Sequence, residues 1–454
     1  MSDHQLARLI PVSHVGSSKE AEMRATSALL AVLHIVRPFS KVLLDPYGAP
    51  KAASSKVDTY IETSFKTPNG VARPDGMIIV EQGKKNQWTA LVEVKTGEAK
   101  LDAEQVNGYY EIARERGYDA VITISNELQP APGVHPTPGI KVRANSKVAI
   151  HHMSWFMIRS LAVIEHDHRK VSDPEQAYIL KELIRYLENP QSGAFEFTDM
   201  GEDWTAIRDG VRDGAVDKKS PAVANIAQKW DQLNRFLALK LSSDTGANVQ
   251  QLLPKPHKDN PTKRSQDLVD LIASGQPLTG VLRIPDTIGD MELSADLRAR
   301  RISTAVSFDA PADRGNKAKL TWLMKQLESS HDSLIIEVWQ KGSRVATTTV
   351  PLSKSREDTS ILLPPDGKDI SRFRLVLNRD MGVGRKASGK GASFVESVTS
   401  IVIDFYDQTV SKLKAVVPAP PKAMKPSDTP TAEPKELEAG WPEVAIAESS
   451  LDEA

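Results

Sequence analysis

The sequence predicts a mixed α/β domain at the N-terminus, followed by a helical region, a β-rich α+β domain and a disordered tail. Helical and strand patterns alternate as far as residue 160, and helical spacing of apolar residues then dominates as far as residue 277. Strand patterns dominate from 278 to 412. The chain has 454 residues, which is too many for one hydrophobic core, so several domains are expected.

The first predicted element is a helix over residues 17–37. Ser17 is followed three positions later by Glu20, which is the capping-box pattern of a helix N-terminus. Pro38 is expected to end this helix, because proline interrupts the backbone hydrogen bonding of a helix interior.

Three strands, a second helix and a fourth strand are predicted to follow. Residues 57–65 alternate apolar and polar side chains with a period of two, which is typical of a half-buried strand. Apolar runs predict the other strands, and amphipathic spacing that ends at Gly117 predicts the helix. These further elements are expected over residues 77–80, 89–95, 102–116 and 120–125.

The rest of the chain divides by composition and pattern. Helical apolar spacing recurs in 173–188 and 221–241, and the proline-containing segment 251–264 is predicted to be a linker. The composition of the last residues, rich in proline and charge, is typical of a disordered tail. The predicted domains are therefore 1–160, 161–277 and 278–412, with the tail over 413–454.

Composition excludes several classes of protein. Lys and Arg number 58 and Asp and Glu number 59, so binding of nucleic acid would require a local basic patch. The chain has no cysteine, which excludes disulfides, iron–sulfur clusters and thiolate zinc sites. It has no apolar run of transmembrane length, and its first residues lack the pattern of a signal peptide. A cytoplasmic protein with no membrane segment is therefore expected.

The stretch "ARPDGMIIVEQGKKNQWTALVEVKTGE", residues 72–98, holds the first candidate site. Glu93 and Lys95 lie two positions apart in a predicted strand, so they share one of its faces. Asp75 opens the neighbouring strand and lies beside Glu93 if the two strands pair. Two converging carboxylates form a site for Mg²⁺ or Mn²⁺, and a neighbouring lysine can orient or deprotonate a water molecule that attacks a phosphate. Hydrolysis of a phosphodiester needs these groups.

The same residues also have a structural interpretation. Arg-Pro-Asp-Gly at 73–76 favours a β-turn, because proline presets φ and glycine tolerates a positive φ. Glu-Val-Lys at 93–95 is typical of any half-exposed strand. Each motif alone therefore favours a structural role over a catalytic one.

Gln105 and Tyr109 in the next predicted helix change this balance. They are four residues apart and so lie on one helical face. Gln105 has a structural alternative too, since Asp102-x-x-Gln105 has the pattern of a helix cap.

The order Asp75, Glu93-x-Lys95, Gln105-x-x-x-Tyr109 on strand, strand and helix resembles the PD-(D/E)xK phosphodiesterases. It is similar to the branch with a Gln-x-x-x-Tyr helix, which includes RecB-like and lambda-exonuclease-like nucleases. The resemblance implies a restriction-endonuclease-like core of helix, three strands, helix and strand. It also implies that Asp75 and Glu93 bind the metal and that Lys95 serves the attacking water. Gln105 and Tyr109 would contact the DNA strand or support the site.

The resembled family often adds a carboxylate from the first helix, and Glu20 and Glu22 are the two candidates. At about 100° per residue, Glu22 lies on the same stripe as Leu29 and Leu33, which is expected to face the sheet. Glu20 lies on the opposite side and already has a capping role. Glu22 is therefore the predicted catalytic carboxylate. The alternative is that the first turn frays and leaves Glu22 in water.

The sequence thus predicts a divalent-metal-dependent nuclease that hydrolyses phosphodiester bonds, with DNA as the expected substrate. Residues 278–412 are expected to recognise the target or a protein partner. The alternative is a nuclease fold with weak or absent activity that acts as a nucleic-acid or protein binding platform in a stress or defence system. The complete set of Asp75, Glu93 and Lys95 favours the enzyme, since a platform does not need these three groups.

Overall fold

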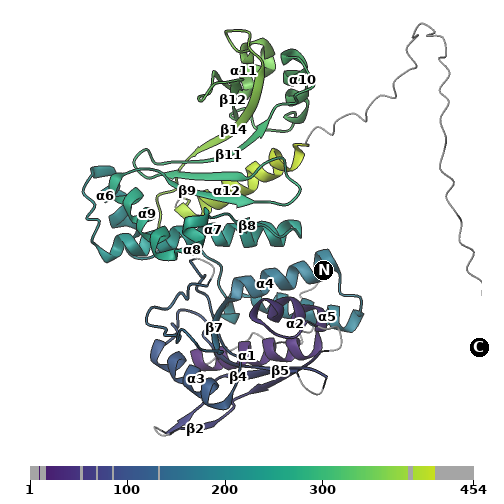
Figure 1. Cartoon of the computed structure of the whole chain (residues 1–454), viewed down its shortest axis with the longest axis vertical. Helices are drawn as coiled ribbons and strands as arrows, with labels where there is room; N and C mark the ends of the chain where they lie inside the picture. Colours follow the sequence, from purple (N-terminus) through teal and green to yellow (C-terminus); the bar gives the residue numbers. More distant parts are fainter. Residues whose placement is uncertain are drawn as a thin grey trace, which may run out of the picture. The chain divides into compact units, whose positions relative to one another are not determined.

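The structure is a computed structural model that describes residue 10 and residues 17–51, 55–67, 70–83, 86–130, 133–386 and 392–414. Within these ranges the fold is mixed α/β, with two large sheets and a short hairpin (Figure 1). The predicted tail lies outside the described residues from position 415 onward.

The first sheet has five strands in the order β1-β4-β5-β6-β7. β1, β4 and β5 pair antiparallel, whereas β5, β6 and β7 pair parallel. The strands are β1 (Lys56–Ile61), β4 (Gly76–Gln82), β5 (Asn86–Val94), β6 (Ala120–Ser125) and β7 (Ala149–Ser154). A separate hairpin joins β2 (Phe65–Thr67) to β3 (Gly70–Ala72).

Helices cover both faces of this sheet. One face packs against α1 (Ser18–Ile35), α2 (Arg37–Leu44), α4 (Trp155–Val163) and α5 (Pro174–Glu188), and the other packs against α3 (Ala103–Arg116). The interpretation of residues 93–95 as part of a half-exposed strand is therefore wrong. β5 is the central strand, and apolar side chains from both helical layers bury it from residue 91 to residue 94.

The first helix begins as predicted but ends earlier. Ser17 caps α1 by accepting a hydrogen bond from the backbone N–H of Glu20 at 3.2 Å. α1 ends at Ile35, and Pro38 lies in the first turn of α2. Proline is tolerated there because its missing N–H would have no partner inside the helix. Pro38 therefore starts a second helix instead of ending the first.

No single helix among the described ranges is both long and apolar enough to cross a membrane. α1 and the following segment Arg37–Tyr47 meet that test only together, across a bend of 109°.

The second sheet has seven antiparallel strands in the order β13-β12-β14-β11-β10-β9-β8. Its strands are β8 (Gln250–Gln251), β9 (Leu278–Arg283), β10 (Met291–Asp296), β11 (Arg301–Asp309), β12 (Ile335–Gln340), β13 (Thr348–Pro351) and β14 (Ile370–Asp380). The helices in this part of the chain are α6 (Trp204–Asp213), α7 (Pro221–Thr245), α8 (Lys255–Asp259), α9 (Pro261–Ser274), α10 (Asn316–Gln326), α11 (Leu352–Glu357) and α12 (Phe394–Gln408). One apolar core joins this sheet to α6, α7, α9 and α12. What residues 278–412 recognise stays a prediction.

The segment 251–264 differs from the predicted linker. It contains α8 and the start of α9, and its prolines lie at helix starts. Asn260 caps α9, and the buried side chain of Arg264 bonds Asp231 of α7 at 2.8 Å. Proline in this segment therefore marks the first turns of helices, and α9 packs onto the core through Leu268 and Ile272.

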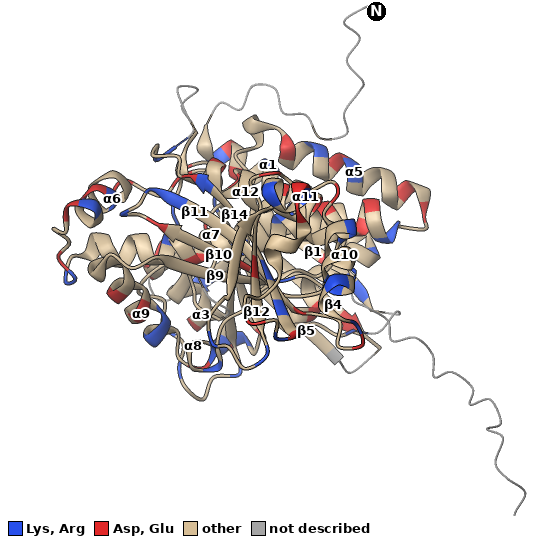
Figure 2. Ribbon diagram, turned by 90° about the horizontal axis from the view of Figure 1, so that it is seen from above, with Lys and Arg blue, Asp and Glu red and all other residues tan. Residues whose placement is uncertain are grey.

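Acidic and basic residues are interspersed along the ribbon (Figure 2). α5 and α6, for example, carry both signs along their lengths. This distribution agrees with the net charge of −1. A charged ligand is therefore expected to be held by particular side chains more than by the field of the whole chain.

Gly76 allows α1 to pack closely on β4. A Cβ atom at this position would lie 2.5 Å from Leu30 Cδ1 and 3.1 Å from the carbonyl oxygen of Tyr60. The backbone of Gly76 does not adopt the positive φ that the β-turn interpretation requires. The glycine is needed because α1 approaches the strand closely at the residue that follows Asp75.

Gly76→Ala is expected to lower the free energy of unfolding by about 1–3 kcal/mol, because the buried side chain of Leu30 would have to move. Urea unfolding measures the change. Gly108→Ala is the matched control, since Gly108 lies in α3 and no atom lies within 4 Å of an added Cβ. That substitution is expected to stabilise the helix by about 0.5–1 kcal/mol. A loss of stability of the same size in both variants would contradict the close approach.

Candidate active site

The predicted site residues meet at one cleft of about 750 Å³. Glu22 enters it from α1, Asp75 from the segment before β4, Glu93 and Lys95 from the end of β5, and Gln105 from α3. Tyr109, the sixth predicted residue, is hydrogen bonded to Gln105. Segments that are far apart in the sequence thus bring all six side chains together.

Strand pairing brings Asp75 beside Glu93. In the antiparallel register of β4 and β5, Gly76 lies opposite Val92. Asp75 precedes Gly76 and Glu93 follows Val92, so these two residues are neighbours across the strands. Asp75 Oδ2 accepts a hydrogen bond from the backbone N–H of Val94 at 2.8 Å. This bond holds the Asp75 carboxylate at the end of β5.

Glu93 is an unusually buried carboxylate. It is 1% exposed, and its Oε2 atom has no hydrogen-bond partner within the described part of the chain. Burial and the charge of Asp75 raise the pKa of Glu93 to about 7, against the opposing effect of Lys95. The Glu93 carboxylate therefore has an unsatisfied oxygen and a reason to take up either a proton or a cation.

Lys95 is the cation among these carboxylates. Its Nζ lies 2.7 Å from Glu93 Oε1 and 3.6 Å from Glu22 Oε2. Burial acts to lower the pKa of Lys95, but the hydrogen bond and charge of Glu93, with the charges of Glu22 and Asp75, outweigh burial and raise it. Lys95 is therefore protonated at neutral pH.

Trp155 holds the backbone of Lys95 in place through a hydrogen bond. The indole Nε1 of Trp155 donates to the carbonyl oxygen of Lys95 at 2.9 Å, and the N–H of Lys95 donates to Ile124 at 2.8 Å. Trp155 is fully buried. The sequence did not predict this role of Trp155. The residues around a buried tryptophan do not indicate which carbonyl group will accept a hydrogen bond from its indole N–H.

The structure distinguishes the two acids of α1. Both acids line the cleft, but Glu22 is partly buried and faces Lys95, whereas Glu20 is exposed and bonds Arg24 at 3.1 Å. Burial and the charge of Asp75 raise the pKa of Glu22, while Lys95 and the backbone N–H of Thr96 lower it. The helical phase calculated from the apolar stripe therefore agrees with the observed geometry.

The metal-dependent cleavage that the sequence predicts is expected to be at least about tenfold slower in Glu22→Gln, because the substitution removes a charge beside Lys95. Glu20→Gln is the matched control. It is expected to cost less than about 1 kcal/mol of stability, through weaker interactions with Arg24 and the helix dipole. Initial rates and thermal melts of both variants measure these effects. Inactivation by Glu20→Gln with activity kept in Glu22→Gln would contradict the assignment.

Gln105 and Tyr109 form a hydrogen-bonded pair that holds the segment before Asp75. Gln105 Nε2 donates to the Tyr109 hydroxyl at 2.9 Å, and that hydroxyl donates to the carbonyl oxygen of Arg73 at 3.0 Å. Burial and the charge of Glu93 raise the pKa of Tyr109, so its hydroxyl remains a donor at neutral pH. The cap of α3 is Asp102, which accepts from the backbone N–H of Glu104. Gln105 thus points at Tyr109 and the cleft instead of capping the helix.

Gln105→Ala is expected to change the free energy of unfolding by less than about 0.5 kcal/mol, since the side chain is exposed. If Gln105 contacts substrate, the substitution should weaken substrate binding by about tenfold. Asp102→Ala is the control: it should cost about 1 kcal/mol of stability and leave kinetics unchanged. Thermal melts beside steady-state kinetics separate the two residues, and a stability loss without a kinetic effect in Gln105→Ala would contradict a role at the cleft.

The carboxylates fit a divalent cation with oxygen ligands. Asp75 and Glu93 converge, and Glu93 Oε2 is without a partner, as a ligand oxygen would be before the ion binds. Together with Glu22 and Lys95 they carry a formal charge of −2. The described residues contain no cluster of three or more His, Cys, Asp or Glu arranged to hold an ion. Mg²⁺ does not require one, because it retains several waters and is commonly held by one or two carboxylates.

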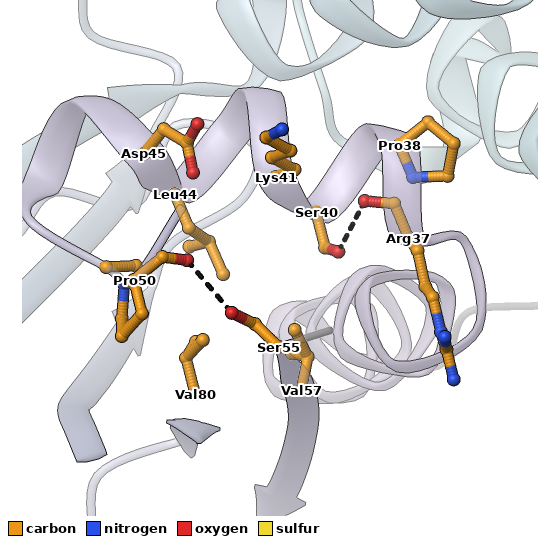
Figure 3. A pocket seen from close by; sticks show the side chains of 11 residues that line it. Arg37, Pro38, Ser40, Lys41, Leu44, Asp45, Pro50, Ser55, Val57 and Val80 are labelled. Carbon is orange, nitrogen blue, oxygen red and sulfur yellow. Dashed lines mark hydrogen bonds between the residues drawn. The ribbon is translucent and has the colours of Figure 1, made fainter. Parts of the chain in front are cut away.

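A second, smaller cavity of about 290 Å³ lies beside α2 (Figure 3). Its lining includes Leu44, Val57 and Val80, and Asp45 is its one carboxylate. Ser40 and Ser55 form hydrogen bonds to neighbouring carbonyl groups there. Because its lining has a single carboxylate, this cavity lacks the pair of acids that metal-dependent phosphodiester hydrolysis would need.

No protein-family model matches the chain, and no curated protein or solved structure is significantly similar to it. The function is therefore inferred from the residues and geometry of the site.

Proposed function

We propose that the chain is a divalent-metal-dependent nuclease that hydrolyses phosphodiester bonds of DNA. The observation that carries this proposal is the buried Glu93 carboxylate, which lies beside Asp75, bonds Lys95 and opens on the cleft of about 750 Å³. A buried acid with a strongly raised pKa in a cleft is characteristic of functional sites.

The proposal includes membership of the PD-(D/E)xK phosphodiesterases, with a restriction-endonuclease-like core. Its support is the sequence resemblance together with the succession α1, β1, β4, β5, α3, β6, into which the chain inserts α2 after α1 and the β2–β3 hairpin after β1. The residues that the resemblance names lie in α1, in the segment before β4, at the end of β5 and in α3. The proposal also includes a cytoplasmic location, and a recognition role for residues 278–412.

Asp75 and Glu93 would hold Mg²⁺ or Mn²⁺. When bound, such an ion acts as a Lewis acid toward the phosphate and offsets its negative charge. The protein itself would bring the two carboxylates close together and shield them partly from bulk water. Burial strengthens each electrostatic interaction in the site, because the local dielectric constant is lower than that of water.

Lys95 would act as a hydrogen-bond donor at the scissile phosphate or the attacking water. Its raised pKa favours this role over that of a general base, since a protonated ammonium cannot accept a proton. Glu22 Oε2 lies 3.6 Å from Lys95 Nζ and would orient the ammonium. Gln105 and Tyr109 would hold the segment that carries Asp75.

The proposal is tested with the full chain on linear duplex, closed circular and single-stranded DNA, in Mg²⁺ or Mn²⁺ and in EDTA. We expect cleavage that requires the metal and is abolished by EDTA. Cleavage of closed circles would identify an endonuclease. Absence of cleavage on every substrate by folded protein would overturn the proposal, and DNA binding without cleavage would favour the alternative of a binding platform.

A further inference from the structure

Two apolar side chains remain exposed at the candidate active site. Met23 is 47% exposed and Ile61 is 52% exposed, and both line the same cleft as Asp75, Glu93 and Lys95. They come from different elements, Met23 from α1 and Ile61 from the end of β1. Single exposed apolar residues are common on protein surfaces. Two on separate elements that line a cleft with convergent polar groups indicate a surface that binds an apolar part of a ligand.

Both side chains are adjacent to the proposed chemistry. Met23 follows Glu22 in α1, and Ile61 is the strand partner of Gly76, the residue after Asp75. The backbone N–H of Glu62 donates to the carbonyl oxygen of Asp75 at 3.1 Å, which holds the end of β1 against this segment. A phosphodiester bound at the carboxylates would therefore place a neighbouring nucleoside close to Met23 and Ile61.

The charges of the cleft are poorly suited to holding a duplex by its phosphates alone. The lining contains four cationic and five acidic side chains. Lys19 and Arg73 are exposed there and have no ion-pair partner within the described ranges, so they are available for phosphates that flank the site. Binding of a DNA backbone ordinarily depends on many such contacts. Contact with bases would supply the remaining affinity.

The face of a base is accessible to an apolar side chain only where the base is unstacked. In a duplex the faces are stacked and the edges are paired, so apolar side chains reach them by opening the stack or by binding single strands. We infer that the nucleotide beside the scissile phosphate is bound unpaired, with its base against Met23 and Ile61. The preferred substrate would then be single-stranded or locally unpaired DNA. This inference rests on the proposed nuclease function and specifies its substrate.

The test measures binding of the full chain to fluorescent oligonucleotides by anisotropy in EDTA, where cleavage does not interfere. We expect a single strand to bind at least about tenfold more tightly than the duplex of the same sequence. A scan with one abasic site is expected to find a position where loss of the base weakens binding about tenfold. Met23→Ala and Ile61→Thr should each weaken binding to the intact strand. Neither substitution should weaken binding to the strand that lacks this base much further.

Val345→Ala is the control, because Val345 is a more exposed apolar residue that does not line the cleft. It should bind as the unmodified chain does. Equal binding of duplex and single strand, or additive effects of Met23→Ala and the abasic site, would overturn the inference. Metal-dependent cleavage without strand preference would leave the nuclease function standing while overturning the base contact. Base-dependent binding with no cleavage in metal would support the contact and overturn the hydrolysis.

Discussion

Asp75→Ala and Glu93→Ala are expected to reduce metal-dependent cleavage by at least about 100-fold, because each removes a carboxylate of the proposed metal site. The folded chain should persist. Asp75→Asn and Glu93→Gln keep the side-chain volumes and, for Asp75, an oxygen that can accept from Val94 N–H. These isosteric variants should be equally inactive. Initial rates in Mg²⁺ measure the effect, with melts to show that each variant is folded.

Lys95→Ala should also inactivate the chain, but for a different reason. Lys95 serves the water or the phosphate in the proposal, so the variant should retain affinity for the metal. Calorimetric titration with Mn²⁺ separates the two roles. Glu81→Ala is a control at the far end of β4, outside the cleft. More than a few per cent of cleavage retained by both acid variants would contradict the site, and a loss of metal affinity in Lys95→Ala equal to that in Asp75→Ala would contradict the division of roles.

Glu93→Gln is expected to stabilise the metal-free chain more at high pH than at low pH. The folded-state pKa of Glu93 is raised from an ordinary value of 4.5 to about 7. Between these values the folded state binds the proton and the unfolded state releases it, so stability falls as pH rises. The stability that protonation of Glu93 contributes is fully present below pH 4.5 and is lost as the pH rises through about 7. Above that pH this loss leaves the folded state less stable than at acid pH by about 3 kcal/mol.

Unfolding of the unmodified chain and Glu93→Gln in EDTA, at one pH below 5 and one above 8, measures this difference. Three buried or partly buried histidines titrate in the opposite sense, because burial lowers the pKa of His135 to about 4, that of His152 to about 3 and that of His151 below its ordinary value. Their stabilising contributions are present above their ordinary pKa of 6.5 and are lost as pH falls. Both proteins contain these histidines, so their effect cancels in the comparison.

Added Mg²⁺ provides an independent check at the higher pH. It should raise the melting temperature of the unmodified chain, since an ion that binds only the folded state stabilises it. It should have little effect on Glu93→Gln. A stability difference between the two proteins that is the same at both pH values would contradict the protonation of Glu93 near neutrality.

The residues of the site could be predicted because local rules govern them. The alternation of side chains in a strand sets Glu93 and Lys95 on one face. A period of 3.6 residues distinguishes Glu22 from Glu20, and the spacing of four joins Gln105 to Tyr109. These patterns depend on backbone geometry that is the same in every helix and strand. The structure agrees with each of them, through the contacts of Lys95 with Glu22 and Glu93 and of Gln105 with Tyr109.

The predictions from sequence were wrong where one local pattern is compatible with several structures. Pro38 is equally suited to follow one helix and to open the next, and the structure uses the second option. The prolines of 251–264 likewise open helices instead of marking a linker. Gly76 looks like a turn residue, yet the close approach of Leu30 is what requires it. In each case the outcome depends on a neighbour that is distant in the sequence.

The sequence by itself determined which side chains carry the candidate chemistry and on which elements they lie. The tertiary structure decided the environment of those side chains. β5 is central and covered on both faces, so Glu93 is buried and its pKa is raised, whereas the Glu-Val-Lys motif is equally compatible with an exposed strand. Periodicity specifies the direction of a side chain relative to its own backbone. Burial, electrostatic coupling and hydrogen bonds such as that from Trp155 to Lys95 depend on which distant segments pack around it.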